Sequence, residues 1–407
     1  STGETIAYWT GSTTTWASAT ATADFAATAT GTPGFPCVGM ANFIITNGVV
    51  MALRSVAINT AAAFYQLIHT NAGTTWTTPD HALAANTPAG NTTDACTGLI
   101  SWLNGATLTA ATLSYNATTK VITLRTATSP AGTWAAATGG TLFSNAAPTA
   151  LKALPDPFGV VRPHIFTQEG VWYWDTAKMN PLQDFSDDIR SNNGKTPVHW
   201  EIDTIPGSMN VWQQGRHIFN VAPTTSGNII PTASNIAPTW QTQGLPIIRD
   251  GPVTNLASAP NFLWASIGGD TAATIAVIYE RVAAYLHPRG WFPLYDLGTA
   301  NRDITAMGYS AADDAIPRLH WAEENGTAGD SDPKFMANVT REPRTVTSYA
   351  HAASGFLIMP VNSRGLDELD GILRKIMFIG TGFTANNNIS AVYVSVDAAP
   401  KASDDSM

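Results

Sequence analysis

The feature that most constrains the fold of this chain is a repeated unit of two apolar strands followed by a Gly/Thr/Trp corner. In the clearer copy, the apolar segments Gly48–Ser55 and Ala63–Ile68 precede the corner Asn71–Trp76. The looser copy consists of Ala111–Tyr115, Val121–Arg125 and Ala131–Trp134. Repeated small antiparallel sheets are typical of radial or stacked β architectures.

Short segments rich in Val, Ile, Tyr, Phe and Trp continue toward the end of the chain and are predicted to be strands. They are 170–176, 198–204, 216–221, 261–267, 274–280, 291–297, 303–310, 318–323, 355–361, 374–379 and 389–396. Helical spacing occurs at 363–373 and at 271–286, where it competes with one of these strands. We therefore expect an all-β chain.

The spacing of the strand pairs predicts a β-propeller. Pairs begin near residues 48, 111, 165, 198, 261, 303 and 355. Steps of about 35–65 residues bracket the usual blade period of about 40–50. We expect one propeller of six to seven antiparallel blades over 1–407. The alternative is a charge-poor, β-sandwich-like domain over 1–155, a linker at 153–157 and a propeller over 156–407.

Tryptophans are expected to fill the space between sheets, because each buries on the order of 200 Å² of surface. The residues assigned to this role are Trp172, Trp174, Trp264, Trp291 and Trp321.

Charge is scarce and unevenly distributed. Charged residues make up 13% of the chain, and residues 1–150 contain only three basic and four acidic ones. So neutral a surface is poorly protected against association, which favours packing against other copies or other proteins. A neutral Thr/Ser-rich surface is the alternative. The net charge of −9 and the lack of a basic stripe argue against nucleic-acid binding, and no apolar window of about 20 residues predicts a membrane span.

Two cysteines, Cys37 and Cys96, lie in the charge-poor part. They form a disulfide if the chain lives in an oxidising compartment, or remain buried thiols otherwise. Without a nearby histidine pattern they make no zinc site.

The segment His69–Trp76 resembles an Asp-box, the hairpin corner of sialidase-type propellers, with His69 and Asn71 in place of the usual Ser and Asp. Two other stretches, Trp291–Asn325 and Arg374–Asp397, resemble modules of β-propeller proteins in tailed-phage particles. This second resemblance implies a structural or adsorption role in a virion or a similar extracellular assembly, and it brings no catalytic residues with it.

No catalytic, cofactor-binding or metal site is predicted. A glycosidase needs two carboxylates about 5–10 Å apart. The candidate pairs are Asp187/Asp188, Glu201/Asp203, Asp313/Asp314 and Glu323/Glu324. We favour a structural interpretation of these pairs, because adjacent acidic residues in turns are usually solvated. Glu201 and Asp203 are expected on the same face of one strand. The oxygen-rich segments 187–194 and 330–332 do not match calcium-loop spacing.

The sequence thus favours a non-enzymatic structural subunit without cofactors, which self-associates in a virion, as a tail or decoration component, or in another extracellular assembly. Its partners are expected to be other copies, other assembly proteins or a surface glycan. One alternative is a carbohydrate- or receptor-binding propeller that uses loop aromatics such as Trp102 and Trp240. Another is a secreted glycan hydrolase.

Overall fold

The structure is a computed structural model, and every regular element that it describes is a β-strand. The described residues are 5–9, 16–20, 37–43, 49–58, 61–69, 76–82, 94–116, 118–128, 135–184, 196–202, 208–221, 234–235, 251–268, 273–279, 292–297, 303–311, 316–324, 331–337 and 339–340. This part of the chain contains no helix that is long and apolar enough to cross a membrane.

The described strands form seven antiparallel sheets, each made of consecutive strands. The first is the hairpin of β1 (Thr5–Trp9) and β2 (Trp16–Thr20). The second contains β3 (Cys37–Phe43), β4 (Val49–Ile58), β5 (Ala61–His69) and β6 (Trp76–Ala82). The third contains β7 (Asp94–Asn104), β8 (Thr107–Asn116), β9 (Val121–Ala127) and β10 (Ala135–Phe143).

The fourth sheet has the same design, and three further sheets of four or three strands follow it. The fourth sheet contains β11 (Pro148–Pro155), β12 (Val161–Thr167), β13 (Gly170–Trp174) and β14 (Met179–Asp184). The fifth contains β15 (Val198–Trp200), β16 (Met209–Gln214), β17 (His217–Val221) and β18 (Ser234–Asn235). The sixth contains β19 (Val253–Ala259), β20 (Phe262–Gly268), β21 (Ala273–Tyr279) and β22 (Phe292–Asp296). The seventh contains β23 (Ile304–Ala311), β24 (Pro317–Glu324) and β25 (Ser331–Ala337).

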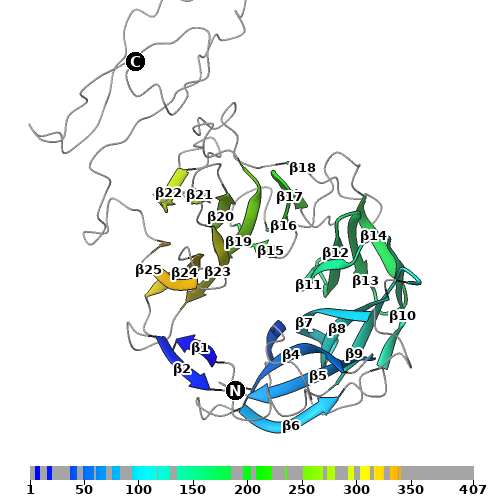
Figure 1. Cartoon of the computed structure of the whole chain (residues 1–407). Helices are drawn as coiled ribbons and strands as arrows, with labels where there is room; N and C mark the ends of the chain where they lie inside the picture. The colour runs from blue at the N-terminus through cyan, green and yellow to red at the C-terminus, as the bar shows by residue number, and fades with distance from the viewer. Residues whose placement is uncertain are drawn as a thin grey trace, which may run out of the picture.

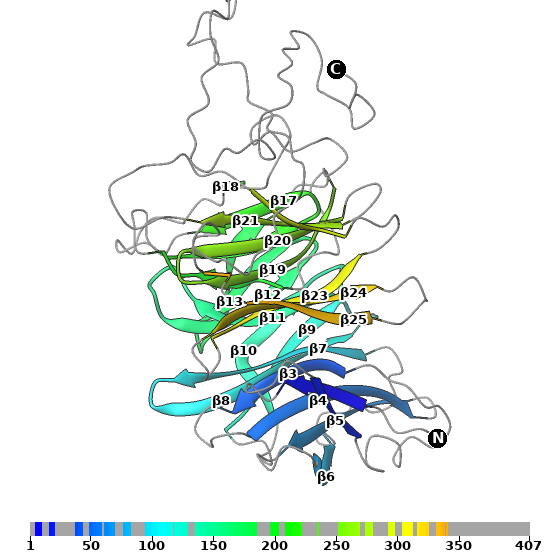
Figure 2. The same cartoon turned by 90° about the vertical axis from the view of Figure 1, so that its left-hand side faces the viewer.

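The sheets follow one another around a ring, which makes the fold a β-propeller (Figure 1). The first strands lie toward the middle, where β7 is next to β3 and β11, and β19 is next to β15 and β23. Figure 2 gives the ring edge-on and shows the sheets layered against each other. The expected all-β propeller of six to seven antiparallel blades is confirmed.

The core is divided among the interfaces between successive sheets. Trp102 and Trp174 lie in the cluster between the third and fourth sheets, and Trp212 in the cluster between the fourth and fifth. Trp200 lies between the fifth and sixth sheets. Trp264 and Trp321 lie between the sixth and seventh. A sheet that has neighbours on both faces buries both faces of its strands, and β8 of the third sheet is accordingly buried along almost its whole length.

The expected role of tryptophan as filler between sheets is confirmed for Trp174, Trp264 and Trp321, which are all buried. Trp172 is half-buried in β13, and Trp291 lies outside the described residues. Trp102 was expected on a loop, but it lies in β7 and is buried against Trp174, with ring centroids 6.4 Å apart. That expectation is wrong because the strand β7 extends to Asn104 and turns Trp102 into the core.

Several strands lie outside the predicted segments, for identifiable reasons. β11, β12, β14 and β25 contain proline, which is unusual within strands. β10 contains Gly139 and Gly140 in a bulge opposite β9. The helical alternative over 271–286 is wrong for 273–279, which is β21, paired on both edges. Prolines and glycines are therefore weak evidence against strands in this chain.

The segment 153–157, the linker of the two-domain alternative, forms the end of β11 and the turn after it. The number of domains itself remains a prediction. The expected strands at 355–361, 374–379 and 389–396, the expected helix at 363–373 and most of the Asp-box-like corner lie outside the described residues.

Candidate functional site

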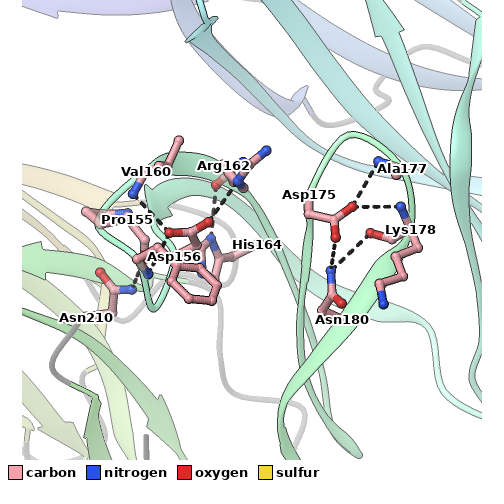
Figure 3. Close-up of polar contacts among 11 residues, drawn as sticks. Pro155, Asp156, Val160, Arg162, His164, Asp175, Ala177, Lys178, Asn180 and Asn210 are labelled. Carbon is pink, nitrogen blue, oxygen red and sulfur yellow. Dashed lines mark hydrogen bonds and ion pairs between the residues drawn. The ribbon is translucent and has the colours of Figure 1, made fainter. Parts of the chain in front are cut away.

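A group of buried and hydrogen-bonded polar side chains lies at one end of the β11–β14 sheet (Figure 3). Two turns form this end, residues 156–160 between β11 and β12 and residues 175–178 between β13 and β14. We call it the Asp156 end. The opposite end of the sheet carries the turn 168–169 between β12 and β13.

Asp156 organises the first turn from inside the protein, because it is only 2% exposed. Its Oδ1 accepts hydrogen bonds from the backbone N–H groups of Phe158 and Val160, both at 2.9 Å. Its Oδ2 accepts a bond from Arg162 Nε at 2.8 Å, which is also an ion pair. Gly159 has a φ of 81°, a conformation that glycine adopts without strain. The turn is therefore rigidly held.

The turn presents apolar side chains to solvent. Phe158 is 59% exposed, and Val160 and Val161 are also exposed. We call these three residues the apolar tip. A fixed backbone that holds an aromatic ring in water is unlike ordinary core packing, and exposed apolar groups of this kind are found at binding sites.

The second turn uses the same hydrogen-bonding arrangement in a more exposed setting. Asp175 Oδ1 accepts from the N–H groups of Ala177 and Lys178, at 2.9 and 2.8 Å. Its Oδ2 accepts from Asn180 Nδ2 at 2.8 Å. Slight burial acts to raise the pKa of Asp175, but these three bonds and the Lys178 charge outweigh it, so the net pKa is lowered.

A row of polar side chains crosses the sheet next to these turns. His164 of β12 is paired with Lys152 of β11 and with Tyr173 of β13, and Tyr173 is paired with Asn180 of β14. Residues directly opposite each other in antiparallel strands share one face of the sheet. We call Lys152, His164, Tyr173 and Asn180 the polar row.

The polar row faces the neighbouring β15–β18 sheet. Phe166 lies two residues after His164 on the same face, and its ring centroid is 6.0 Å from that of Trp212 in β16. Asn210 Nδ2 crosses the interface and donates to the carbonyl of Pro155 at 2.6 Å. Asn210 Oδ1 lies 3.0 Å from Nδ1 of His199. The interface is thus apolar around Phe166 and polar toward the Asp156 end.

His164 is the most deeply buried member of the row. Its Nδ1 lies 3.0 Å from the Arg162 carbonyl, which can only accept, so Nδ1 carries the proton. Burial lowers the pKa of His164 to about 4, although the bond to Arg162 and the Asp156 charge act to raise it. Nε2 is therefore an unprotonated acceptor, and it is buried without a hydrogen-bond partner.

The two neighbours of His164 remain in contact with water. Lys152 is exposed to solvent, yet protein atoms surround it closely enough that desolvation lowers its pKa. Tyr173 is half-buried and stacks on His164, with ring centroids 5.8 Å apart. Burial raises the pKa of Tyr173, and the charges of Asp156 and Asp175 raise it further. The row therefore combines a cation, an imidazole acceptor, a phenol and an amide.

The acidic pairs proposed from the sequence do not meet at this site. Glu201 is exposed after β15. Glu323 is buried and accepts a bond from Trp321 Nε1 at 2.8 Å, next to Glu324 in β24. Asp187, Asp188, Asp203, Asp313 and Asp314 lie outside the described residues, as does Trp240. Among the described side chains, no group of three or more His, Cys, Asp or Glu residues could hold a metal ion.

This arrangement suits binding better than bond cleavage. Asp156 and Asp175 each use both carboxylate oxygens to hold a turn. The groups that remain are the exposed Phe158 ring and Lys152 ammonium and the half-buried Tyr173 phenol and Asn180 amide, which are groups that can orient a ligand through stacking and hydrogen bonds.

No family model and no curated protein matches the chain. Among solved structures, a leech intramolecular trans-sialidase complexed with 2,7-anhydro-Neu5Ac matches 75% of this chain and 68% of its own, with 9% identity and a TM-score of 0.39. An α-L-arabinofuranosidase from Fusarium graminearum matches 75% of this chain and 94% of its own, with 10% identity and a TM-score of 0.37.

Prolyl oligopeptidase B from Galerina marginata matches 70% of this chain, with 12% identity and a TM-score of 0.39, and the chain spans 39% of its length. Similarities this low carry no argument about family or activity. The assignment of a β-propeller rests on the seven described sheets of the chain itself and on their packing around a ring.

Proposed function

We propose that this chain is a carbohydrate-binding propeller module that holds a glycan at the Asp156 end without cleaving it. The observation that carries the proposal is the rigid turn that exposes Phe158 beside the polar row. Sugars present apolar C–H faces and a rim of hydroxyls, so they need a fixed apolar or aromatic surface with a few planar polar groups nearby. The apolar tip supplies the first and the polar row supplies the second.

The rigidity of the turn also favours binding. Five hydrogen bonds fix residues 156–162: three to the Asp156 carboxylate and two between the backbones of Asp156, Gly159 and Val160. A turn whose backbone is fixed before the ligand arrives loses little backbone entropy on binding. The glycan-binding alternative from the sequence is thus retained, but with Phe158 in place of Trp102 as the aromatic contact.

Self-association in an extracellular assembly or virion is a second candidate. The specific observation in its favour is Phe143, which is 64% exposed at the end of β10. Phe143 is paired with Val121, and Val121 with Asn116. These residues lie at the opposite end of their sheet from Trp102, whose ring contacts Trp174 beside the Asp175 turn. Phe143 therefore offers an apolar contact away from the Asp156 end.

The two exposed phenylalanines give a matched pair of variants. We expect the protein to bind members of a glycan array, Phe158→Ala to weaken that binding at least tenfold by calorimetry, and Phe143→Ala to leave it unchanged. An array without binders, or equal loss in both variants, contradicts the proposal. Sedimentation equilibrium of the same proteins tests the second candidate, which predicts an oligomer that Phe143→Ala dissociates.

A further inference from the structure

We propose that the turn between β7 and β8 is a self-modification site, at which Asn104 loses its side-chain amide through attack by the backbone nitrogen of Gly105. The modification does not depend on glycan binding. Asn104 is paired with Thr107 at the tip of the hairpin, and only Gly105 and Ala106 form the turn. The other Asn–Gly pairs of the chain, at 47–48, 193–194 and 325–326, lie outside the described residues.

The reaction needs no partner other than water. Hydroxide removes the proton of the Gly105 nitrogen, which then forms a bond to Cγ of Asn104. The Cγ–Nδ2 bond breaks, and the amide leaves as ammonia with a proton from water. Water then opens the resulting five-membered succinimide ring. Attack at Cγ leaves an ordinary aspartate, whereas attack at the main-chain carbonyl leaves isoaspartate, in which the chain runs through Cβ and Cγ.

Gly105 leaves its own nitrogen accessible. Its φ is 63°, and a Cβ at this position would meet no atom within 4 Å, so the space around the turn is open. Glycine has no side chain that could hinder ring closure. In a two-residue hairpin the ladder ends at the pair that flanks the turn. No residue of the described ranges accepts a hydrogen bond from the Gly105 N–H.

The side chain of Asn104 is free to turn toward this nitrogen, unlike that of Asn116 at the other end of β8. Asn116 Oδ1 accepts hydrogen bonds from the N–H groups of Thr118 and Thr119, at 3.0 and 2.8 Å. Asn104 is exposed, and among the described residues none forms a hydrogen bond with its side chain. The backbone must also rotate, but the last pair of a hairpin opens at little cost in free energy.

The modification adds a negative charge at one end of the third sheet. Trp102, two residues before Asn104, is buried against Trp174, which directly precedes the Asp175 turn. The new carboxylate therefore lies at the end of the third sheet that adjoins this turn. Isoaspartate also lengthens the main chain by one atom and shifts the closing pair of the hairpin. The packing of Trp102 should confine that shift to the tip.

The test follows the folded full chain in mildly alkaline buffer by peptide mass spectrometry. We expect the peptide with Asn104 to gain the mass difference between OH and NH2 about tenfold faster than the peptide with Asn116, because Asn104 is followed by glycine and its side chain is not held. The rate should rise with pH, since hydroxide removes the amide proton. Enzymatic methylation of the same peptide identifies isoaspartate. Asn104→Gln should abolish the change, because glutamine would have to close a larger ring.

A denatured sample separates the effect of the fold from that of the sequence. A rate at Asn104 in the folded chain within about tenfold of that in the denatured chain supports the assignment, because it shows that the hairpin opens readily. A peptide that reacts only after denaturation shows that the turn blocks ring closure, and overturns the inference. Equal rates at Asn104 and Asn116 in the folded chain, or no change at Asn104 in either sample, overturn it as well.

Discussion

The Asp156 and Asp175 turns are built from the same hydrogen bonds but present different surfaces (Figure 3). In each, one carboxylate oxygen accepts two backbone N–H groups and the other accepts a side-chain donor. Asp156 is buried and its turn exposes apolar residues, whereas Asp175 is half-buried and its turn ends in the exposed Ala177 and Lys178.

The comparison shows that the hydrogen bonds that hold a turn do not determine which side chains the turn exposes. An aspartate that accepts two backbone N–H groups fixes a turn wherever it lies. Burying it behind Arg162 makes the Asp156 turn more dependent on its hydrogen bonds, because a buried charge that loses its partners is costly. The buried aspartate is found in the turn that exposes the Phe158 ring to solvent.

The largest expected difference between the two turns is in stability. Asp156→Ala leaves two backbone donors and Arg162 without their acceptor, so we expect it to lower the free energy of unfolding by about 3 kcal/mol. Asp175→Ala leaves donors that water reaches, and should cost about 1 kcal/mol. Urea unfolding measures both. Equal losses in the free energy of unfolding would show that the burial of Asp156 does not make its hydrogen bonds more important for stability.

Acid should weaken the Asp156 end through His164. Its pKa is about 4 in the folded chain, against 6.5 as its ordinary value. The unfolded chain therefore binds this proton more tightly, and stability is lost as the pH falls from about 6.5 to about 4. The full shift corresponds to about 3 kcal/mol. The free energies of unfolding of the wild type and of His164→Gln, measured across this pH range, should fall with different slopes. The two slopes should be equal if His164 is not buried as a neutral ring.

The smallest expected effects come from the backbone of the two turns and have opposite signs. Gly159 and Thr176 both have a φ of 81°. A Cβ at Gly159 would meet no atom within 4 Å, so Gly159→Ala costs only conformational strain, about 1 kcal/mol. Thr176→Gly relieves a similar strain, but glycine loses more conformational entropy on folding, which offsets part of the gain. We expect it to raise the free energy of unfolding by about 0.5 kcal/mol. Thermal unfolding tests both, and effects of one sign would contradict this account.

The sequence was sufficient to predict the fold class but not the site. Alternating and fully apolar segments identify strands such as β8, β20 and β24, and their spacing indicates blades. Strands with proline, such as β11 and β12, escape this pattern because their prolines are accommodated at strand ends or opposite Ala153. Tryptophan predicts packing between sheets well, since a side chain so large is seldom left in water.

The polar row could not be predicted because it depends on register. Lys152, His164 and Tyr173 are far apart in sequence and meet only because β11, β12 and β13 pair as they do. A bulge near Pro148 at the start of β11 is part of that register, and a slip of one residue would turn every side chain to the other face. Asp156 looks like a linker residue between two prolines, and nothing in its neighbours indicates its burial.

The division of the core into separate slabs between sheets has a mechanical consequence. The fourth, fifth and sixth sheets each have an apolar cluster on both faces, so separating one of them from its neighbours would expose two apolar surfaces at once. Because the Asn210 side chain donates to the Pro155 carbonyl, a force applied at the apolar tip is shared with the β15–β18 sheet. It therefore does not act on the Asp156 turn alone. A propeller built this way resists force applied to the turns at the ends of its sheets, which is where a bound polymer would pull.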